Sequence, residues 1–392
     1  MNEATVEWYA WRLGGMVPGT TKTHLLRACL EQGDVVRAAW DGFVRSVADP
    51  KTYFEDDFGG LKALLPIVER GLSLGDVDAG PGFSTYARVA VVREELRDRI
   101  YREVFESTLQ LLEPSVAPPL VLRGLAIAET CYEQPQRRHN HGIDLLLDEG
   151  ALWSASRVLT EAGYTVVQGG AAAVHRRHRH RSGLPVTLHS RLFEMPHLGE
   201  PADLRSRAVA FVAGGKHLNT LDPADHLVHV CGHAAYSRSR ANLRWVCDAV
   251  LLIRHVPGLD WERLEHTAVM SGLGLPVAVA LTYLSRCFDV PIPPDRVARL
   301  YRQCAIDLPH VRAAVHAIAL ECPAPGAENR PAVWTPTVAR LRMLAFRSVP
   351  SAAYMRWKYG AEGLVSLARS YLGRGIGFLS RRLRHLPGTL LR

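Results

Sequence analysis

Apolar residues recur every three or four positions through the first third of the chain, and glycine and proline interrupt the runs. Segments 25–47, 58–72 and 86–112 show this spacing most clearly, as in "YARVAVVREELRDRIYREVFESTLQLL". Such spacing places the apolar side chains on one face of an α-helix. The pattern therefore predicts an N-terminal helical region over residues 1–116.

The pattern changes to short strands between residues 117 and 220. "PPLVLRGLAIAETCY" predicts a strand, a glycine and a helix, and "HGIDLLL" predicts a buried strand. For the helix predicted next, over 148–163, we expect Asp148 as the N-cap and Gly163 at the end. "AAVHRRHRHR" and "LPVTLHSRL" are typical of a β-hairpin that turns at Ser182 and Gly183.

Helical spacing returns with "DPADHLVHVCGHAAY" and continues toward the C-terminus. It predicts a helical domain over 221–328 and a basic helical C-terminal region over 329–392. Together the segments indicate an α+β fold. In this fold a small, mixed, twisted sheet within residues 117–220 is flanked by N-terminal and C-terminal helical regions.

The composition is that of a folded protein of 392 residues, with 47% hydrophobic and 22% charged residues. The seven cysteines contain no CxxC pair, which argues against a disulfide framework and a zinc knuckle. The N-terminus lacks signal-peptide character, and no apolar stretch reaches the ~18 residues of a membrane span. We therefore expect a cytoplasmic protein, with peripheral attachment at a membrane as the alternative.

Positive charge is concentrated in the C-terminal region. From residue 330 onward there are eleven arginines and Lys358 but a single acid, Glu362, which gives this part a formal charge of +11. Because the whole chain has a formal charge of +8, residues 1–329 sum to −3. Three interpretations remain open, in this order: packing of basic helices against the net-acidic remainder, binding to an anionic membrane surface, and binding to nucleic acid. Nucleic acid is third because aromatic residues for stacking are sparse.

One carboxylate, Asp144, interrupts the apolar strand in "RRHNHGIDLLLDEG". A buried carboxylate costs several kcal/mol unless a cation or hydrogen-bond donors meet it. The position therefore indicates a function for Asp144. By contrast, His226, His229 and His233 share one face of a predicted helix, a pattern more typical of a core or an interface than of a metal site.

Two other polar clusters each have two interpretations. Four arginines and three histidines between His175 and Arg181 either protect a sheet edge or lie over an anionic ligand such as a triphosphate, a nucleic acid or an acidic peptide. Arg244 and Asp248, four positions apart, form either an intrahelical ion pair or a pair that orients a substrate.

Several of these segments, taken in order, resemble one family. "VLRGLAIAETCY", "RRHNHGIDLLLDEG", "RVLTEAGY", "VTLHSRL", "PADHLVHVCGHAA" and "LRWVCDAVLLI" followed by "LDWERL" are similar to the uncharacterised bacterial nucleotidyltransferases of the polymerase-beta superfamily. The resemblance runs from about residue 120 to about residue 264. It implies a twisted sheet with three metal-binding carboxylates, two on a DxD strand and one on a neighbouring strand. It also implies Mg²⁺ as cofactor and a nucleoside triphosphate (NTP) as substrate.

The chain departs from this family pattern at the acids. Arg138 matches the arginine before the first acid, and Asp144 matches the second acid. Gly142 stands in the place of the first acid and Thr187 in that of the third, while His189 matches the histidine that follows. The resemblance therefore implies Asp144 as the remaining metal ligand, in a weakened Mg²⁺ site, and Asp144 with His189 as catalytic residues.

The same resemblance implies a nucleotide-binding set, namely Arg123, Gly124, Arg138, Gly142 and Thr187. Arg123 and Gly124 lie at a predicted strand-to-helix turn, where backbone amides suit a phosphate. Glu194 reaches the site only if the chain bends sharply after the strand of "VTLHSRL", which the sequence does not require.

Two classes of function follow. The first is transfer of a nucleotidyl group from an NTP to a peptide or small-molecule acceptor, because family members are often found with peptide natural-product biosynthesis, including that of lasso peptides. The second is a non-catalytic accessory protein that binds a peptide, a nucleotide or an enzyme partner, since two of the three acids are replaced. Apart from these two classes, a third possibility is repurposed chemistry, in which Asp144 and His189 act as an acid/base pair without two metals.

Overall fold

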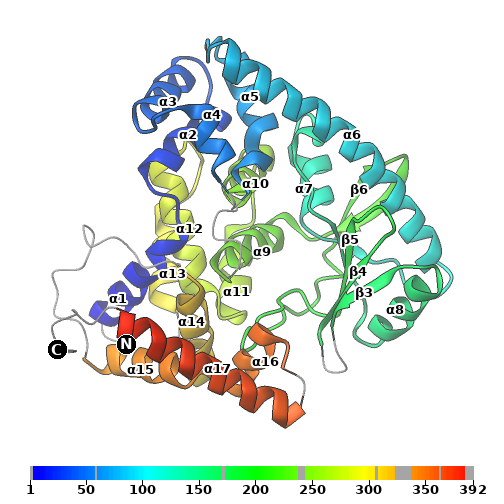
Figure 1. Ribbon diagram of the computed structural model, residues 1–392, viewed down its shortest axis with the longest axis vertical. Helices are drawn as coiled ribbons and strands as arrows, with labels where there is room; N and C mark the ends of the chain where they lie inside the picture. The colour runs from blue at the N-terminus through cyan, green and yellow to red at the C-terminus, as the bar shows by residue number, and fades with distance from the viewer. Residues whose placement is uncertain are drawn as a thin grey trace.

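A computed structural model describes residues 3–57, 60–169, 173–236, 243–304, 308–322, 337–361 and 363–384. A mixed sheet lies on one side of the molecule, and helices form most of the rest (Figure 1). This arrangement confirms the α+β class. Among the described residues no helix is both long and apolar enough to span a bilayer.

The N-terminal third is helical, as predicted. Its helices are α1 (Glu3–Leu13), α2 (Thr20–Leu30), α3 (Asp34–Arg45), α4 (Pro50–Glu55), α5 (Leu65–Leu74) and α6 (Pro81–Leu112). The long helix α6 runs past the sheet, where Tyr101, Val104 and Phe105 belong to the core that the sheet forms (Figure 1).

The sheet contains seven strands in the order β3-β4-β5-β2-β1-β7-β6. They are β1 (Leu120–Val121), β2 (Ile143–Leu146), β3 (Thr165–Gln168), β4 (His175–Arg179), β5 (Pro185–His189), β6 (Val209–Ala213) and β7 (Lys216–Thr220). β2 pairs in parallel with β5, and β1 with β7, while the remaining pairs are antiparallel.

The two faces of the central strands differ because successive side chains alternate. Ile143, Leu145 and Val186 lie in a core shared with α6 and with α8 (Leu152–Glu161). The opposite face carries Asp144, which stands beside Thr187 in the parallel register of β2 and β5. The chemistry-bearing side chains therefore face away from the α6–α8 side.

Two local predictions hold and two are wrong. The hairpin turns at Gly183 with φ of +86°, and the chain leaves α8 at Gly163 with φ of +91°, conformations that suit glycine. Asp148 does not cap α8: it precedes a 3₁₀ turn without a side-chain cap and pairs with Arg205 at 2.5 Å. The hairpin strand rich in arginine, β4, is not an edge strand, because β3 covers its outer side.

The other helices pack around a second, larger core that the N-terminal helices share. They are α7 (Gly124–Cys131), α9 (Pro223–Tyr236), α10 (Arg244–His255), α11 (Trp261–Met270), α12 (Gly274–Cys287), α13 (Pro294–Gln303), α14 (Pro309–Glu321), α15 (Thr337–Ser348), α16 (Ala352–Tyr359) and α17 (Gly363–Arg384). In the basic C-terminal region, Tyr354 and Met355 are buried and Lys358 pairs with Glu321. Packing, the first interpretation of this region, therefore holds for α16.

Candidate functional site

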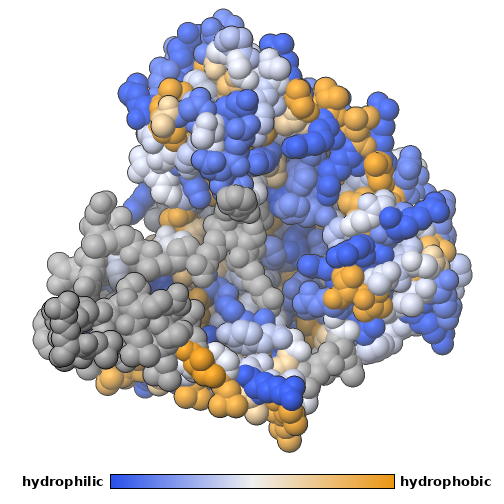
Figure 2. Space-filling model, in the orientation of Figure 1, coloured by the Kyte–Doolittle hydropathy of each residue, from blue (hydrophilic) through white to orange (hydrophobic). Residues whose placement is uncertain are grey.

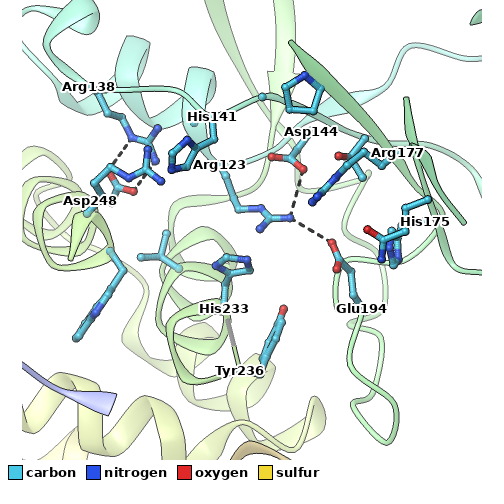
Figure 3. Close-up of a pocket in the computed structure, with 18 of the residues that line it drawn as sticks. Arg123, Arg138, His141, Asp144, His175, Arg177, Glu194, His233, Tyr236 and Asp248 are labelled. Atoms are coloured by element: carbon cyan, nitrogen blue, oxygen red, sulfur yellow. Dashed lines mark hydrogen bonds and ion pairs between the residues drawn. The ribbon is translucent and has the colours of Figure 1, made fainter. Parts of the chain in front are cut away.

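A polar cavity of about 540 Å³ lies on the face of the sheet that carries Asp144 (Figure 3). Residues from β2, β3, β4, β5, α7, α9, α10 and α16 line it. Six residues expected from the sequence are among them: Arg123, Gly124, Arg138, Gly142, Asp144 and Thr187. The structure thus brings together residues that are 64 positions apart in the sequence at the extremes of this set, from Arg123 to Thr187.

Asp144 is held by two partners. The Nη2 atom of Arg123 lies 3.4 Å from its Oδ1 atom, and Nε2 of His189 lies 2.9 Å from the same oxygen. Burial alone would raise the pKa of Asp144, but the charge of Arg123 and the hydrogen bond from His189 lower this pKa well below its ordinary value. Asp144 is therefore a stable carboxylate and a weak base.

His189 does not face the cavity, contrary to the expected acid/base pair. Its side chain is fully buried behind Asp144. Its Nδ1 atom lies 3.3 Å from Oε1 of Glu194, so the ring stands between two carboxylates. This arrangement makes His189 a positioning residue for Asp144 rather than a group that touches a ligand.

Glu194 could reach the site only if the chain bends after β5, and the structure contains that bend. Its Oε1 atom lies 3.5 Å from Nη2 of Arg123, and its side chain lines the cavity. Burial raises the pKa of Glu194, but His189 and Arg123 outweigh burial and lower this pKa to about 2. The site therefore contains a second ionised carboxylate.

Arg123 links these two acids (Figure 3). It precedes α7 with φ of +48°, a strained conformation for a residue other than glycine. Burial would lower the pKa of its guanidinium, but Asp144 and Glu194 raise it. Its Nε atom is buried and has no hydrogen-bond partner among the described residues. One donor of this side chain thus lacks an acceptor among the described residues.

The two glycines of the expected nucleotide-binding set are required for close packing. A Cβ atom on Gly124 would meet Oδ1 of Asn140 at 2.5 Å, and a Cβ atom on Gly142 would meet the carbonyl oxygen of Pro185 at 2.6 Å. Gly142 therefore lets β2 approach β5. The structure gives a packing reason for glycine at the position where the family pattern has an acid.

Arg138 is largely engaged by the protein. Its Nε and Nη2 atoms donate to the two oxygens of Asp248 at 2.8 and 2.7 Å, and Nη1 donates to Asn140 at 2.6 Å. Tyr132 donates a further hydrogen bond to Asp248 at 2.8 Å. Asp248 is thus paired with Arg138, 110 positions away. The interpretation of Asp248 as the intrahelical partner of Arg244 did not include this contact.

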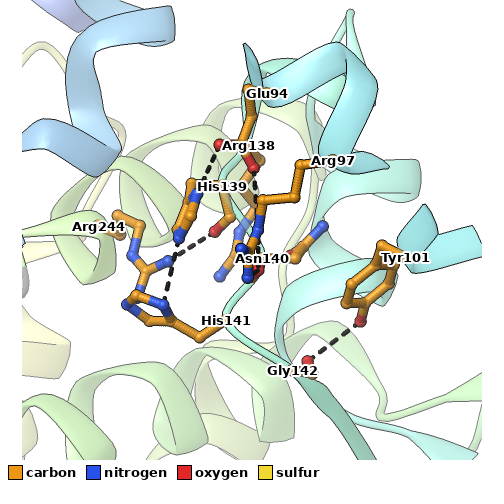
Figure 4. A network of polar contacts seen from close by, with 9 residues as sticks. All are labelled: Glu94, Arg97, Tyr101, Arg138, His139, Asn140, His141, Gly142 and Arg244. Atoms are coloured by element: carbon orange, nitrogen blue, oxygen red, sulfur yellow. Dashed lines mark hydrogen bonds and ion pairs between the residues drawn. The ribbon is translucent and has the colours of Figure 1, made fainter. Parts of the chain in front are cut away.

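The loop that joins Arg138 to β2 is fixed at three carbonyl groups (Figure 4). Arg244 donates to the His139 carbonyl at 2.6 Å, Arg97 to that of Asn140 at 3.0 Å, and Tyr101 to that of Gly142 at 3.1 Å. These bonds hold the backbone that leads into Asp144.

The same loop presents His141 to the cavity. His139 bonds to Glu94 at 2.6 Å and to His141 at 3.2 Å (Figure 4). Burial and the neighbouring Arg244 lower the pKa of His141 to about 3, so this imidazole is neutral near pH 7.

The arginine-rich strand β4 divides its side chains between two faces. Arg176 stacks on Trp153 with 4.0 Å between guanidinium carbon and ring centroid, and His178 bonds to Ser156 at 2.9 Å. His175 and Arg177 instead line the cavity. Arg176 and His178 are therefore structural. The other two face the cavity, where the exposed Arg177 stands opposite Thr187.

The histidine stripe of α9 lies mainly in the core. His226 and His229 are buried, and desolvation lowers the pKa of His226 to about 4. His233 lines the cavity, and burial together with Arg123 lowers its pKa to about 3. All three are neutral near pH 7, which agrees with a core or interface role.

Comparison with known families agrees with this geometry. Residues 62–289 match the family model described as an uncharacterised nucleotidyltransferase. The chain belongs to this nucleotidyltransferase family. A comparison with curated proteins gives no match.

The nucleotidyltransferase family implies Mg²⁺, and the residues of this cavity do not fit a pair of such ions. Hard divalent cations need several free oxygen ligands. Here the oxygens of Asp144 and Glu194 already face the guanidinium of Arg123. Within the described ranges, no group of three or more His, Cys, Asp or Glu side chains could hold a metal ion.

Some cavity residues of this nucleotidyltransferase-family chain were not expected from the sequence. Tyr236 comes from the end of α9, Trp245 from α10 and Trp357 from α16. A period of two along β4 was available in the sequence and would have separated His175 and Arg177 from Arg176 and His178. No comparable signal exists for Trp357, because it comes from a helix more than 160 residues after β5.

Proposed function

We propose that this nucleotidyltransferase-family chain binds the phosphates of an NTP in the polar cavity, and that its metal-carboxylate set is degenerate. One observation carries the proposal: arginines line a cavity whose carboxylates are already paired with arginine. Arg177 is exposed, and among the described residues its side chain forms neither a hydrogen bond nor an ion pair. It is the arginine most open to a phosphate.

The size and the lining of the cavity support the same ligand. Small-molecule sites commonly enclose roughly 300–1,000 Å³, and this cavity encloses about 540 Å³. Trp245 and Trp357 contribute aromatic surface to it. Arginine forks suit phosphate oxygens, and aromatic rings suit a base.

Substitution of Arg177 by alanine tests nucleotide binding. We expect the wild-type chain to bind at least one of ATP, GTP, CTP and UTP in a calorimetric titration. Arg177→Ala should weaken that binding about tenfold, because a charge-assisted hydrogen bond contributes on the order of 1.5 kcal/mol.

Arg179→Ala is the matched control, because Arg179 is exposed on the same strand but does not line the cavity. Its affinity should equal that of wild type. Equal losses for both variants would point to a general charge effect and against a site at Arg177, and the absence of NTP binding would reject the proposed function.

Nucleotidyl transfer to a peptide or small-molecule acceptor, as in natural-product biosynthesis, is the second candidate. The hydrogen bond between Asp144 and His189 supports it, because it fixes a carboxylate in the cavity. The lowered pKa of Asp144 favours the alternative of a non-catalytic accessory protein. Incubation with α-labelled NTP and candidate peptides distinguishes the two: label transfer that Asp144→Ala abolishes would establish the enzyme.

We also propose that the basic C-terminal helices contact an anionic membrane surface. Leu364, Val365, Leu372 and Ile376 are more than 65% exposed on α17, and Arg369 is exposed near them. Figure 2 shows exposed apolar side chains along the lower edge, where α17 lies. An apolar helix face flanked by arginine is suited to an anionic lipid interface.

Co-sedimentation with lipid vesicles tests this surface. The chain should sediment with vesicles that contain phosphatidylserine and much less with purely zwitterionic vesicles. Leu372→Glu with Ile376→Glu should abolish sedimentation, whereas Val89→Glu, on the exposed face of α6, should not. Sedimentation that survives the double substitution would reject α17 as the contact.

A further inference from the structure

We infer that the guanidinium of Arg123 takes the place of a divalent cation between Asp144 and Glu194, so that this chain binds its NTP as the free, metal-free polyanion. The inference rests on the proposed nucleotide binding and goes beyond it, because it specifies the ionic form of the ligand. It also reverses the metal dependence that the family relationship implies.

The position of Arg123 is the first argument. Its Nη2 atom lies 3.4 Å from Asp144 and 3.5 Å from Glu194 (Figure 3). A cation that bridges two carboxylates occupies just such a position. Because the side chain of Arg123 is only 17% exposed, its displacement by Mg²⁺ would leave a buried guanidinium without a counter-charge, which is strongly unfavourable.

The backbone keeps Arg123 at this position. The residue directly precedes α7, and Gly124 packs so closely against Asn140 and Arg138 that no Cβ atom fits there. Behind these acids, Nε2 of His189 bonds to Asp144, and Nδ1 of the same ring lies 3.3 Å from Glu194. The trio of Arg123, Asp144 and Glu194 is thus a built ionic cluster rather than a chance surface contact.

The charge of the cavity is the second argument. Four arginines and three carboxylates line it, which gives a formal charge of +1 while His141, His175 and His233 are neutral. A cavity with this charge attracts a free NTP more strongly than its magnesium complex, because Mg²⁺ cancels two negative charges of the triphosphate. A site with three free acids would have the opposite preference.

A third argument is the open donor on Arg123. Its Nε atom is buried without a hydrogen-bond partner among the described residues, and buried donors are normally satisfied. An oxygen of the ligand is a suitable acceptor. Arg123 would then bind a phosphate oxygen through Nε and hold Asp144 and Glu194 through Nη2, much as a metal ion is coordinated by protein and ligand oxygens together.

The experiment is a titration of the full-length chain with ATP, GTP, CTP and UTP, once with EDTA and once with excess Mg²⁺. We expect binding in EDTA and about tenfold weaker binding in Mg²⁺. In Arg123→Met, which removes the charge and keeps the length, binding in EDTA should fall at least about tenfold, and Mg²⁺ or Mn²⁺ should now strengthen it, because two carboxylates lose their cation.

Arg177→Ala is the matched control, since it removes a cavity arginine that does not pair with these acids. It should weaken binding under both conditions and remain inhibited by Mg²⁺. Thermal unfolding verifies that each variant folds. If Arg123→Met does not fold, Arg123→Lys replaces it, and the inhibition by Mg²⁺ should shrink because one ammonium group cannot span both acids as the guanidinium does.

The outcomes separate the two proposals. Wild-type binding that requires Mg²⁺, or that Mg²⁺ strengthens, would overturn the inference and leave the proposed nucleotide binding intact. Arg123→Met that is still inhibited by Mg²⁺, like Arg177→Ala, would also overturn it. Absence of binding under both conditions would reject the proposed function and the inference with it.

Discussion

Substitution of Asp248 by alanine is expected to lower the free energy of unfolding by about 3–5 kcal/mol, because it leaves a buried guanidinium unpaired. Arg138 is 7% exposed and donates to both oxygens of Asp248. Tyr132 would lose its acceptor as well. Urea unfolding followed by far-UV circular dichroism measures the change.

Two further variants make this expectation specific. The exposed pair Arg157 and Glu161, at 3.7 Å on α8, offers a matched control, and Glu161→Ala should change stability by less than about 0.5 kcal/mol. The double variant Arg138→Met with Asp248→Leu should recover part of the loss, since apolar residues replace both buried charges. A loss in Asp248→Ala no greater than that of the control would contradict the structural role of this pair.

Local elements of the fold were accessible from the sequence because each depends on neighbouring residues. The spacing of "YARVAVVREELRDRIYREVF" specifies α6, and Ser182 and Gly183 specify the hairpin turn. The order of the strands was not accessible in this way. That β3 covers β4 depends on how α8 packs against the sheet, which no short pattern contains.

The site divides in the same manner. Asp144 was recognisable because a carboxylate within an apolar strand needs a partner, and the structure supplies Arg123. Glu194 was uncertain because its position depends on the path of the chain after β5, and Trp357 was missed because α16 is distant in sequence. What the sequence could not show is which cation compensates the acids, since that depends on the approach of α7 to the sheet.

The structure also gives a different explanation for Gly142, the glycine at the position where the family pattern has an acid. From the sequence alone, Gly142 is interpreted as the loss of a metal-binding carboxylate. In the structure it is a contact between two parallel strands, with the Pro185 carbonyl on the other side. A side chain at position 142 is therefore disfavoured by packing, and the arginine between Asp144 and Glu194 belongs to the same rearranged site.

Substitution of Gly142 by alanine is accordingly expected to cost about 1–3 kcal/mol, the usual range for an overpacked core. The added Cβ atom would lie 2.6 Å from the carbonyl oxygen of Pro185 and 2.7 Å from its Cγ atom. Gly142→Asp should lose at least as much, because its Cβ atom is the same and its carboxylate adds charge beside Asp144. Urea unfolding of the three chains measures these differences.

Gly82→Ala is the matched control, because nothing lies within 4 Å of a Cβ atom at that position in α6; its stability should equal that of wild type or exceed it by up to about 1 kcal/mol, since alanine favours a helix more than glycine does. Gly142→Asp combined with Thr187→Glu would restore, in the sequence, the three metal-binding carboxylates of the family pattern. We expect that variant to be destabilised and to gain no Mg²⁺-dependent nucleotidyl transfer, because β2 and β5 must separate to accept the new side chain. A stable double variant that transfers label from α-labelled NTP would show instead that the missing acids alone disable the site.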